Sequence, residues 1–452
     1  MARICGTLVA AHFCRRVRAS SDKSAWNRVA LRSASSYTYR LMSTLPRAVT
    51  RLLPGVAVSV VLAAPAAAQT WTPAWGGRGP LSTTITTTST FKDAVPSLGG
   101  RTLRVMARLT TGGSQVRVRL SQRFSASSLS VGAAHVAVRS SGTGIVPGTD
   151  RTLTFHGASS VTVPAGGDVW SDPVALAVTA GKDLAISVYL PGSFTPTTEG
   201  GRAQVKTSYY LSGNQVASVS FPFGLPTHQV FVAYEVDVLS PGRAAAIVTL
   251  GDSITEGACS SMDANGDWPD LLSARLPALA DGTAVAVFNA GIGSGRFASS
   301  DGAGLRGLTR LDELLTLPSV RWVTVLMGVN DISYEHVDAA FLEDAYAQAI
   351  VKAHAAGVKI IGIPILPFGH SSKDVGANKQ VAQAVNAWIR SHNKRLGAPE
   401  PGFDAVVDLE PVMKDARDPA WALSPSLTCD HVHPNQAGYS AIAKAIPLDA
   451  FD

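Results

Sequence analysis

Ser253 is the first residue whose type and surroundings indicate chemistry. It lies in the segment Gly-Asp-Ser at 251–253, between an apolar run and a stretch of helical character. A serine at such a junction exposes its hydroxyl group, and its backbone N–H points toward the same space. These groups suit a nucleophile and one donor of an oxyanion hole. The alternative is a serine that only caps the following helix.

Asp430 and His433 supply the groups that a serine nucleophile needs. An Asp three residues before a His can accept a hydrogen bond from Nδ1 of the ring, which leaves the other nitrogen free to act as a base. A competing interpretation takes Asp430, His431 and His433 as metal ligands. A closed metal site needs a fourth ligand, and the sequence has no Cys, His and Glu cluster of matching spacing elsewhere. We therefore expect catalysis without a metal or any other cofactor.

Two further segments can stabilise a developing oxyanion. Asn330 lies in Gly-Val-Asn-Asp at 328–331, and its amide can donate to negative charge, although Asn is also common in turns. The segment Asn-Ala-Gly-Ile-Gly-Ser-Gly-Arg at 289–296 lets backbone N–H groups approach a ligand closely. Its alternatives are an ordinary strand–helix loop and a phosphate cradle, but it lacks the Lys-Ser/Thr of a P-loop.

Alternating strands and helices are expected to position these segments. Apolar runs predict buried strands at 245–250, 284–288, 322–327, 358–365 and 403–409. Helical stretches lie between or after them, at 268–276, 339–355, 378–395 and 435–445. The pattern predicts a doubly wound parallel sheet with helices on both faces. In such sheets the sites form at the carboxyl ends of the strands, which is where the four segments fall.

The preceding half of the chain has the period-two pattern of strands. Apolar residues alternate with polar or small ones at 103–109, 116–120 and 184–190, which predicts strands with one buried face. Gly- and Pro-rich turns separate them, and no stretch is helical. Many short strands at this spacing predict an all-β sandwich or jelly roll over residues 69–242, followed by the α/β domain over 243–452.

Residues 1–68 are expected to be a leader. From Met42 the chain has two arginines, an apolar run at 52–64 and small residues before Gln69, which is the pattern of a signal peptide over 42–68 cleaved near Ala68-Gln69. Residues 1–41 are interpreted as an upstream misreading of the start. The apolar run is shorter than the roughly 20 residues that a membrane span needs, so a retained anchor is the less favoured alternative. We expect a secreted or periplasmic protein with no membrane span after cleavage.

The net charge of +6 does not indicate a nucleic-acid partner. Ten Lys and Arg residues but a single acid, Asp22, precede Gln69, so the rest of the chain has a net charge of −3. An acidic remainder lacks the basic surface that phosphate binding requires.

The four segments occur in the order found in the SGNH/GDSL hydrolase family, which residues 244–447 resemble. The chain looks most similar to the subgroup of secreted bacterial arylesterases and acyl hydrolases, some of them associated with xylan breakdown; Trp-Thr-Pro-Ala-Trp at 71–75 matches the start of that subgroup's β-rich domain. The resemblance implies that Ser253 is the nucleophile, His433 the base and Asp430 the residue that orients it.

The same resemblance implies an oxyanion hole made by Asn330 and the backbone N–H of Ser253. A third donor in the family is usually a glycine N–H, and alignment without gaps places Ser294 there. Supporting roles are expected for residues beside these donors, namely Asp252, Gly293 and Asp331.

Cleavage of the leader would leave two of the four cysteines, Cys259 and Cys429. Cys259 follows Ser253 closely and Cys429 precedes His433 closely, so both lie near one point if that serine and histidine meet. An oxidising compartment would then favour a disulfide between them, the alternative being two unrelated thiols.

The sequence therefore predicts a secreted serine esterase for small-molecule or polysaccharide esters. Short acyl esters are expected, including acetyl groups on plant polysaccharide by family analogy. The alternatives are a lipase or thioesterase for longer acyl chains, and a carbohydrate-binding protein with an inactive hydrolase domain. Four intact segments argue against the inactive domain.

Overall fold

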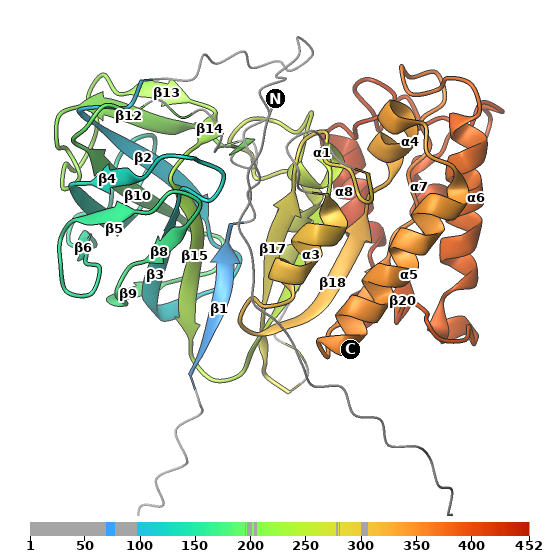
Figure 1. Cartoon of the computed structure of the whole chain (residues 1–452), viewed down its shortest axis with the longest axis horizontal. Helices are drawn as coiled ribbons and strands as arrows, with labels where there is room; N and C mark the ends of the chain where they lie inside the picture. The colour runs from blue at the N-terminus through green and yellow to red at the C-terminus, as the bar shows by residue number, and fades with distance from the viewer. Residues whose placement is uncertain are drawn as a thin grey trace, which may run out of the picture. The chain divides into compact units, whose positions relative to one another are not determined.

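The structure is a computed structural model of the whole chain (Figure 1). It describes residues 69–76, 97–194, 196, 201–202, 206–276, 279, 281–299 and 306–451. The predicted leader, its cleavage site up to Ala68 and the proposed start at Met42 lie outside the described residues. Within the described part of the chain, no helix is long and apolar enough to cross a membrane.

The first half is built from antiparallel strands. One sheet has the order β1-β15-β3-β8, with β9 paired to β3, and a six-stranded sheet has the order β13-β12-β2-β10-β5-β6. The pairs β11-β14 and β4-β7 complete this half. The strands are β1 Thr70–Trp75, β2 Arg101–Arg108, β3 Gly113–Ser121, β4 Leu129–Val131, β5 Ala133–Val138, β6 Arg151–Leu153, β7 Val161–Val163, β8 Asp168–Trp170, β9 Val174–Val178, β10 Asp183–Leu190, β11 Gly201–Arg202, β12 Ser208–Ser212, β13 Leu225–Thr227, β14 Gln229–Val230 and β15 Ala233–Ser240.

The two larger sheets share one hydrophobic core, to which β2 and β10 of one sheet and β3 and β15 of the other contribute. The prediction of one buried face holds for β3 but is wrong for β2 and β10, which are buried on both faces. On the second face of β2, Met106 packs in a small separate cluster, and Arg104 is fully buried. The guanidinium donates to Ser187 Oγ at 2.8 Å and to the carbonyl oxygens of Thr143 and Ser218 at 2.7 Å. Ser187 lies on β10, and Thr143 and Ser218 lie in loops distant in sequence, so the alternation within β2 could not reveal this second buried face.

The second half contains a five-stranded parallel sheet. Its strands are β16 Ala244–Gly251, β17 Ala284–Gly291, β18 Val320–Leu326, β19 Lys359–Gly362 and β20 Ala405–Val406, in the order β17-β16-β18-β19-β20. All five strands were predicted, but β19 and β20 are shorter than the apolar runs at 358–365 and 403–409. The apolar residues of those runs that lie outside the strands, such as Ile363, Ile365 and Val407, are buried in the core without belonging to a strand.

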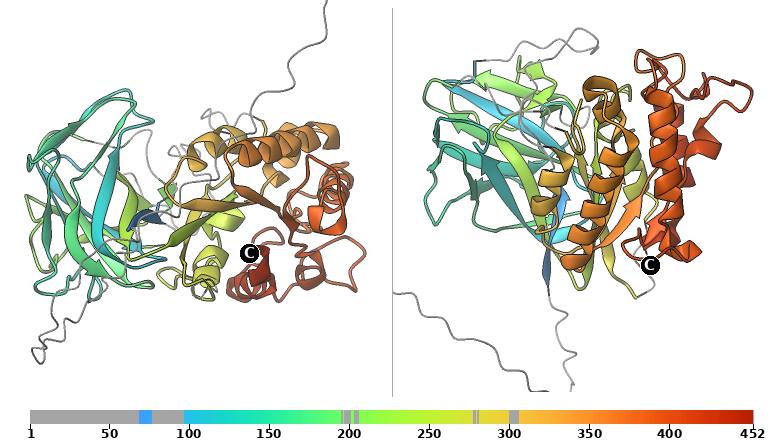
Figure 2. Two further views of the ribbon diagram at one scale, coloured as in Figure 1. Left: turned by 90° about the horizontal axis from the view of Figure 1, so that it is seen from below. Right: turned by 45° about the vertical axis from the view of Figure 1, so that its right-hand side comes forward.

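Helices pack against both surfaces of this sheet. The four predicted helices are α2 Trp268–Ser273, α5 Ala339–Ala355, α6 Asn378–Ser391 and α8 Gln436–Ala445. The helical character expected directly after Ser253 corresponds to α1 Ser253–Glu256. Helices that were not predicted are α3 Gly307–Leu314, α4 Val329–Glu335 and α7 Glu410–Met413, with 3₁₀ turns at Lys394–Leu396 and Leu448–Phe451. One core cluster joins α3, α5 and α6 to the sheet and another joins α2 and α8 to it, on opposite sides in Figure 2.

The α/β half therefore has the predicted parallel sheet, and the first half is antiparallel as expected. The doubly wound and jelly-roll descriptions and the domain boundaries stay predictions. The two halves touch: Thr110 Oγ1 accepts a hydrogen bond from the backbone N–H of Val287 at 3.1 Å, and Ser319 Oγ donates to the carbonyl of Trp71 at 2.8 Å. Arg123 of the first half also pairs with Glu313 of α3.

Candidate active site

Ser253 is the first residue of α1, directly after β16 and Asp252. The Asp252 side chain caps the helix by accepting from the N–H of Ile254 at 2.9 Å. A Cβ at Gly251 would lie 1.9 Å from Thr255 Oγ1, so only glycine lets the strand turn this tightly into the helix. The sharp turn presents the Ser253 side chain at the carboxyl end of the sheet.

His433 and Asp430 come from the loop before α8. The Oγ of Ser253 lies 2.8 Å from Nε2 of His433, and Nδ1 of the same ring lies 2.7 Å from Oδ2 of Asp430. Oδ1 of Asp430 accepts from the backbone N–H groups of Val432 and His433 at 3.0 and 2.7 Å. These bonds form an Asx-type turn that fixes the carboxylate beside the ring. The structure thus brings together the three residues predicted as a triad.

The charge of Asp430 sets the tautomer of His433. Partial burial acts to raise the pKa of Asp430, but its hydrogen bonds to His433 and to the backbone N–H of Val432 outweigh this and lower it to about 2. An ionised carboxylate only accepts hydrogen bonds, so the proton of a neutral His433 must be on Nδ1. Nε2 then carries the lone pair and accepts from the Ser253 hydroxyl.

A disulfide joins Cys259 to Cys429, with Cα atoms 6.4 Å apart. Cys259 lies just after α1 and Cys429 in the loop that carries His433, so the bond ties the serine segment to the histidine loop. The backbone of the loop closes on itself beside the bond, because the N–H of Cys429 donates to the carbonyl of His433 at 3.1 Å.

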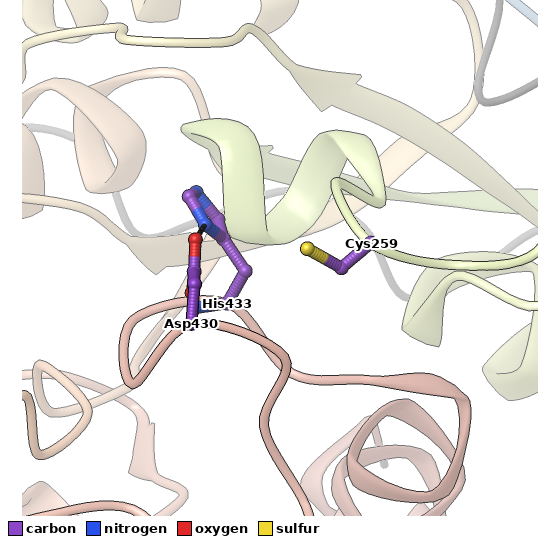
Figure 3. A group of neighbouring side chains, drawn as sticks. All are labelled: Cys259, Asp430 and His433. Carbon is purple, nitrogen blue, oxygen red and sulfur yellow. Dashed lines mark hydrogen bonds and ion pairs between the residues drawn. The ribbon is translucent and has the colours of Figure 1, made fainter. Parts of the chain in front are cut away.

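Figure 3 shows Cys259 close to Asp430 and His433, and atoms of the three residues lie within 4.8 Å of one another. Among the described residues this is the one group of His, Cys, Asp and Glu atoms near enough to hold a metal ion. A sulfur bonded to Cys429 is not a thiolate, however, and both ring nitrogens of His433 already have partners. This geometry argues against the alternative metal site, and His431, its third proposed ligand, is exposed outside the group.

Asn330 is buried in α4, with 2% of its surface exposed, and does not lie in a turn, the alternative considered for it from the sequence. Its Nδ2 donates to the carbonyl of Gly295 at 3.0 Å, which links it to the glycine-rich segment. Its Oδ1 accepts from Nζ of Lys373 at 2.9 Å. One hydrogen of Nδ2 is left to donate to a substrate oxygen.

The glycine-rich segment after β17 packs tightly against α1. A Cβ at Gly291 would lie 2.2 Å from the backbone nitrogen of Glu256, so a side chain there would displace the segment, whereas a Cβ at Gly293 would meet only the end of the Glu256 side chain, at 2.8 Å. Ser294 is exposed and has a φ of 60°, in the left-handed region that favours glycine. This backbone favours the glycine that the family resemblance led us to expect, but the chain has a serine there.

Asp331 holds the next residues of that segment in place. Its carboxylate is fully buried and accepts from the N–H groups of Phe297, Ala298 and Ser299 at 2.7 to 2.8 Å, and from the Ser299 hydroxyl at 2.8 Å. The supporting role expected of Asp331 is thus a structural one.

Two buried groups beside the site have shifted pKa values. Burial raises the pKa of Asp252 to about 6, although its bond from the N–H of Ile254 acts in the opposite direction. Burial lowers the pKa of Lys373 to about 8, against the attraction of Asp252 and Asp430. Lys373 was missed by the sequence analysis. No spacing signal links it to Asn330, since it lies in a loop after β19.

Residues 249–441 match the model of the GDSL-like Lipase/Acylhydrolase family. The α/β region therefore carries the sequence signature of the GDSL/SGNH lipase and acylhydrolase family. The xylan-associated arylesterase subgroup stays a prediction. No curated protein matches the chain.

Three of the solved structures that are similar to this chain each align with less than half of its residues. A GDSL-like lipase from Bacteroides thetaiotaomicron is 21% identical, with 45% of this chain and 87% of that chain covered and a TM-score of 0.33. An aryl esterase of M. smegmatis, in an inhibitor-bound form, is 15% identical, with 46% and 100% covered and a TM-score of 0.34. A protein named TesA is 24% identical, with 44% and 94% covered and a TM-score of 0.32.

Proposed function

We propose that the protein is an exported serine esterase that hydrolyses short acyl esters through an acyl-enzyme. The observation that carries the proposal is the continuous chain of contacts from Ser253 through His433 to Asp430, at 2.8 and 2.7 Å. Nucleophile, base and orienting carboxylate in this order are the groups by which serine hydrolases form and hydrolyse an acyl-enzyme.

Acylation begins when Oγ of Ser253 attacks the ester carbonyl and its proton passes to Nε2 of His433. The imidazolium so formed is stabilised by the ionised Asp430. Collapse of the tetrahedral intermediate breaks the bond to the leaving alkoxide, which takes the proton from Nε2. Water, deprotonated by the same nitrogen, then attacks the acyl-enzyme and releases the acid and Ser253.

The oxyanion of the intermediate is stabilised by hydrogen bonds that strengthen as charge develops. The donors in this proposal are Nδ2 of Asn330 and the backbone N–H groups of Ser253 and Ser294. Loss of one such donor typically reduces kcat by about 10²- to 10³-fold. The fixed amide of Asn330 supports this assignment because its geometry is set before substrate binds.

The cavity next to the serine segment gives no room for a long acyl chain. Asp252, Ile254, Val329 and Val432 are among its lining residues, Ser253 and His433 are not, and it holds only about 10 Å³, roughly one water molecule. Acetyl esters of polysaccharide are the substrates we propose by family analogy. Export through the signal peptide at 42–68 would suit such an extracellular substrate and would favour the disulfide.

The proposal is tested with a panel of chromogenic acetyl, butyryl and longer esters, together with acetylated xylan. Ser253→Ala and His433→Ala should each abolish hydrolysis without unfolding, since the pair acts as a unit. His431→Ala is the matched control and should keep most of the activity, because that side chain is exposed. Mass spectrometry of exported protein should find an N-terminus at or near Gln69.

A serine-directed phosphonate should label Ser253 alone in the same material. Labelling of another serine, with activity retained by Ser253→Ala, would show that the proposed chemistry is wrong. A preference for long acyl chains would keep the mechanism but replace the proposed substrates.

A further inference from the structure

Lys373 is buried against α4, although it belongs to the loop between β19 and α6. Its Nζ donates to Oδ1 of Asn330 and to Oγ of Ser333, each at 2.9 Å. The ammonium also lies 4.3 Å from the centre of the Tyr334 ring. All three partners are on one face of α4, at helical spacings of three and four residues. The ammonium group is therefore fixed by two hydrogen bonds and one cation–π contact.

The contact with Lys373 determines how the Asn330 amide is oriented. An ammonium group only donates, so the atom facing it must be Oδ1, and the carbonyl of Gly295 must face Nδ2. The amide therefore cannot rotate by half a turn without placing a donor against a donor and an acceptor against an acceptor. A cation on the amide oxygen also draws electron density from the nitrogen, which makes Nδ2 a stronger donor.

We propose that Lys373 is a positioning residue that holds Asn330 in its oxyanion-binding orientation and strengthens its N–H as a donor. This inference rests on the proposed esterase function, because Asn330 has an oxyanion to bind only if Ser253 attacks a carbonyl group. Lys373 touches Asn330 and not the substrate, so its contribution passes through the amide.

The loop around Lys373 is built to keep the side chain in place. Its backbone N–H donates to Ser371 Oγ at 3.1 Å, and its carbonyl accepts from Nδ2 of Asn378 at 3.0 Å. Ser371 Oγ in turn donates to the carbonyl of Phe368 at 2.6 Å. A buried ammonium without such support would be costly, which favours a functional reason for its burial.

Four charged or titratable groups from other elements face the ammonium. Asp252 and Asp430 attract it and Arg296 repels it. The phenol of Tyr334 presents its ring to Lys373, and Arg296 lies 5.2 Å from the centre of the same ring. Arg296 is also paired with Glu335 at 2.8 Å, which lessens the repulsion.

The test compares Lys373→Met, which removes the charge and the donors at similar length, with Lys373→Arg, which keeps both. Steady-state kinetics on a short chromogenic ester should show that Lys373→Met lowers kcat by about tenfold or more with KM changed less than about threefold, as expected for a transition-state interaction. In an Asn330→Ala background the same substitution should cost less than about threefold, because the residue through which it acts is absent.

Lys379→Met is the matched control. Lys379 also ties down this loop, through Asp374 at 3.0 Å and the carbonyl of Ala420 at 3.2 Å, but it has no contact with Asn330. It should keep kcat within about twofold, which separates loss of the amide contact from loosening of the loop.

The pH profile gives an independent reading. Wild-type kcat should fall as the pH rises through about 8, where Lys373 loses its proton, whereas Lys373→Arg should keep its activity to higher pH. This comparison also decides the matter if the Met variant fails to fold, which thermal melting would reveal.

Unchanged kcat in a folded Lys373→Met variant would overturn the inference. An equal loss in the wild-type and Asn330→Ala backgrounds would also overturn it, because Lys373 would then act independently of the amide. The proposed function fails separately, when Ser253→Ala retains activity, so the two failures cannot be confused.

Discussion

Replacing Asp430 with Asn should inactivate the enzyme by reversing a tautomer. Oδ1 of Asp430 accepts from two backbone N–H groups, those of Val432 and His433, while Oδ2 faces Nδ1 of His433. An asparagine would keep its one oxygen on the two backbone donors, so its NH₂ group would face Nδ1. The ring proton would then move to Nε2, where it opposes deprotonation of Ser253.

The size of the expected loss of kcat follows from the number of hydrogen bonds that each oxygen of the Asp430 carboxylate accepts. Two backbone bonds at 2.7 and 3.0 Å outweigh one bond to the ring, so the inactive orientation should dominate. A wrong tautomer of this kind costs about 10⁴ in kcat in serine proteases with the same triad. We expect a loss of about 10³- to 10⁴-fold with little change in KM, since Asp430 does not touch the substrate.

The assay is steady-state hydrolysis of a short chromogenic ester, with circular dichroism to show that the variant is folded. Asp418→Asn is the matched control: Asp418 pairs with Nε2 of His370 at 2.7 Å and also accepts from a backbone N–H, that of Ala420. It should keep kcat within about threefold. A kcat for Asp430→Asn within tenfold of wild type would refute the tautomer argument.

Two further predictions concern stability and pH. Replacing Cys259 and Cys429 with Ser should destabilise the protein by up to about 5 kcal/mol, which is the chain-entropy value for a sequence separation of 170. It should also lower kcat, because the His433 loop would be less firmly held. An unchanged melting temperature would contradict the prediction. The pKa of Asp252 is raised to about 6 in the folded protein, so ionisation of this carboxyl group opposes folding. As the pH rises from about 4 to 6, the free energy of unfolding of wild type should therefore fall by up to roughly 3 kcal/mol relative to that of Asp252→Asn. Denaturant melts of both proteins at pH 4 and pH 7 check this, and parallel stability at the two pH values would contradict it.

Much of the site could be predicted because its proposed catalytic side chains lie in short segments that can be recognised in the sequence. Ser253 follows an apolar strand and precedes a helix start, and His433 follows its carboxylate by three residues, so local geometry alone constrains each group. The rule that parallel strands end at one edge of a sheet then brings the segments together. The proximity of Cys259 to Cys429 followed from the same reasoning.

The sequence by itself determined that the first half is built from antiparallel strands and that the second half has five parallel strands, because hydrophobic periodicity indicates both. It also determined which residues meet at Ser253, because the order of the segments along the chain places them at one edge of the sheet. Only the tertiary structure decided that β2 is buried on both faces, that Asp331 anchors the glycine-rich segment, and that Lys373 fixes Asn330. The physical reason is that these features depend on loops distant in sequence closing over a strand or helix. Such closure follows from packing of the whole fold, and no local spacing records it.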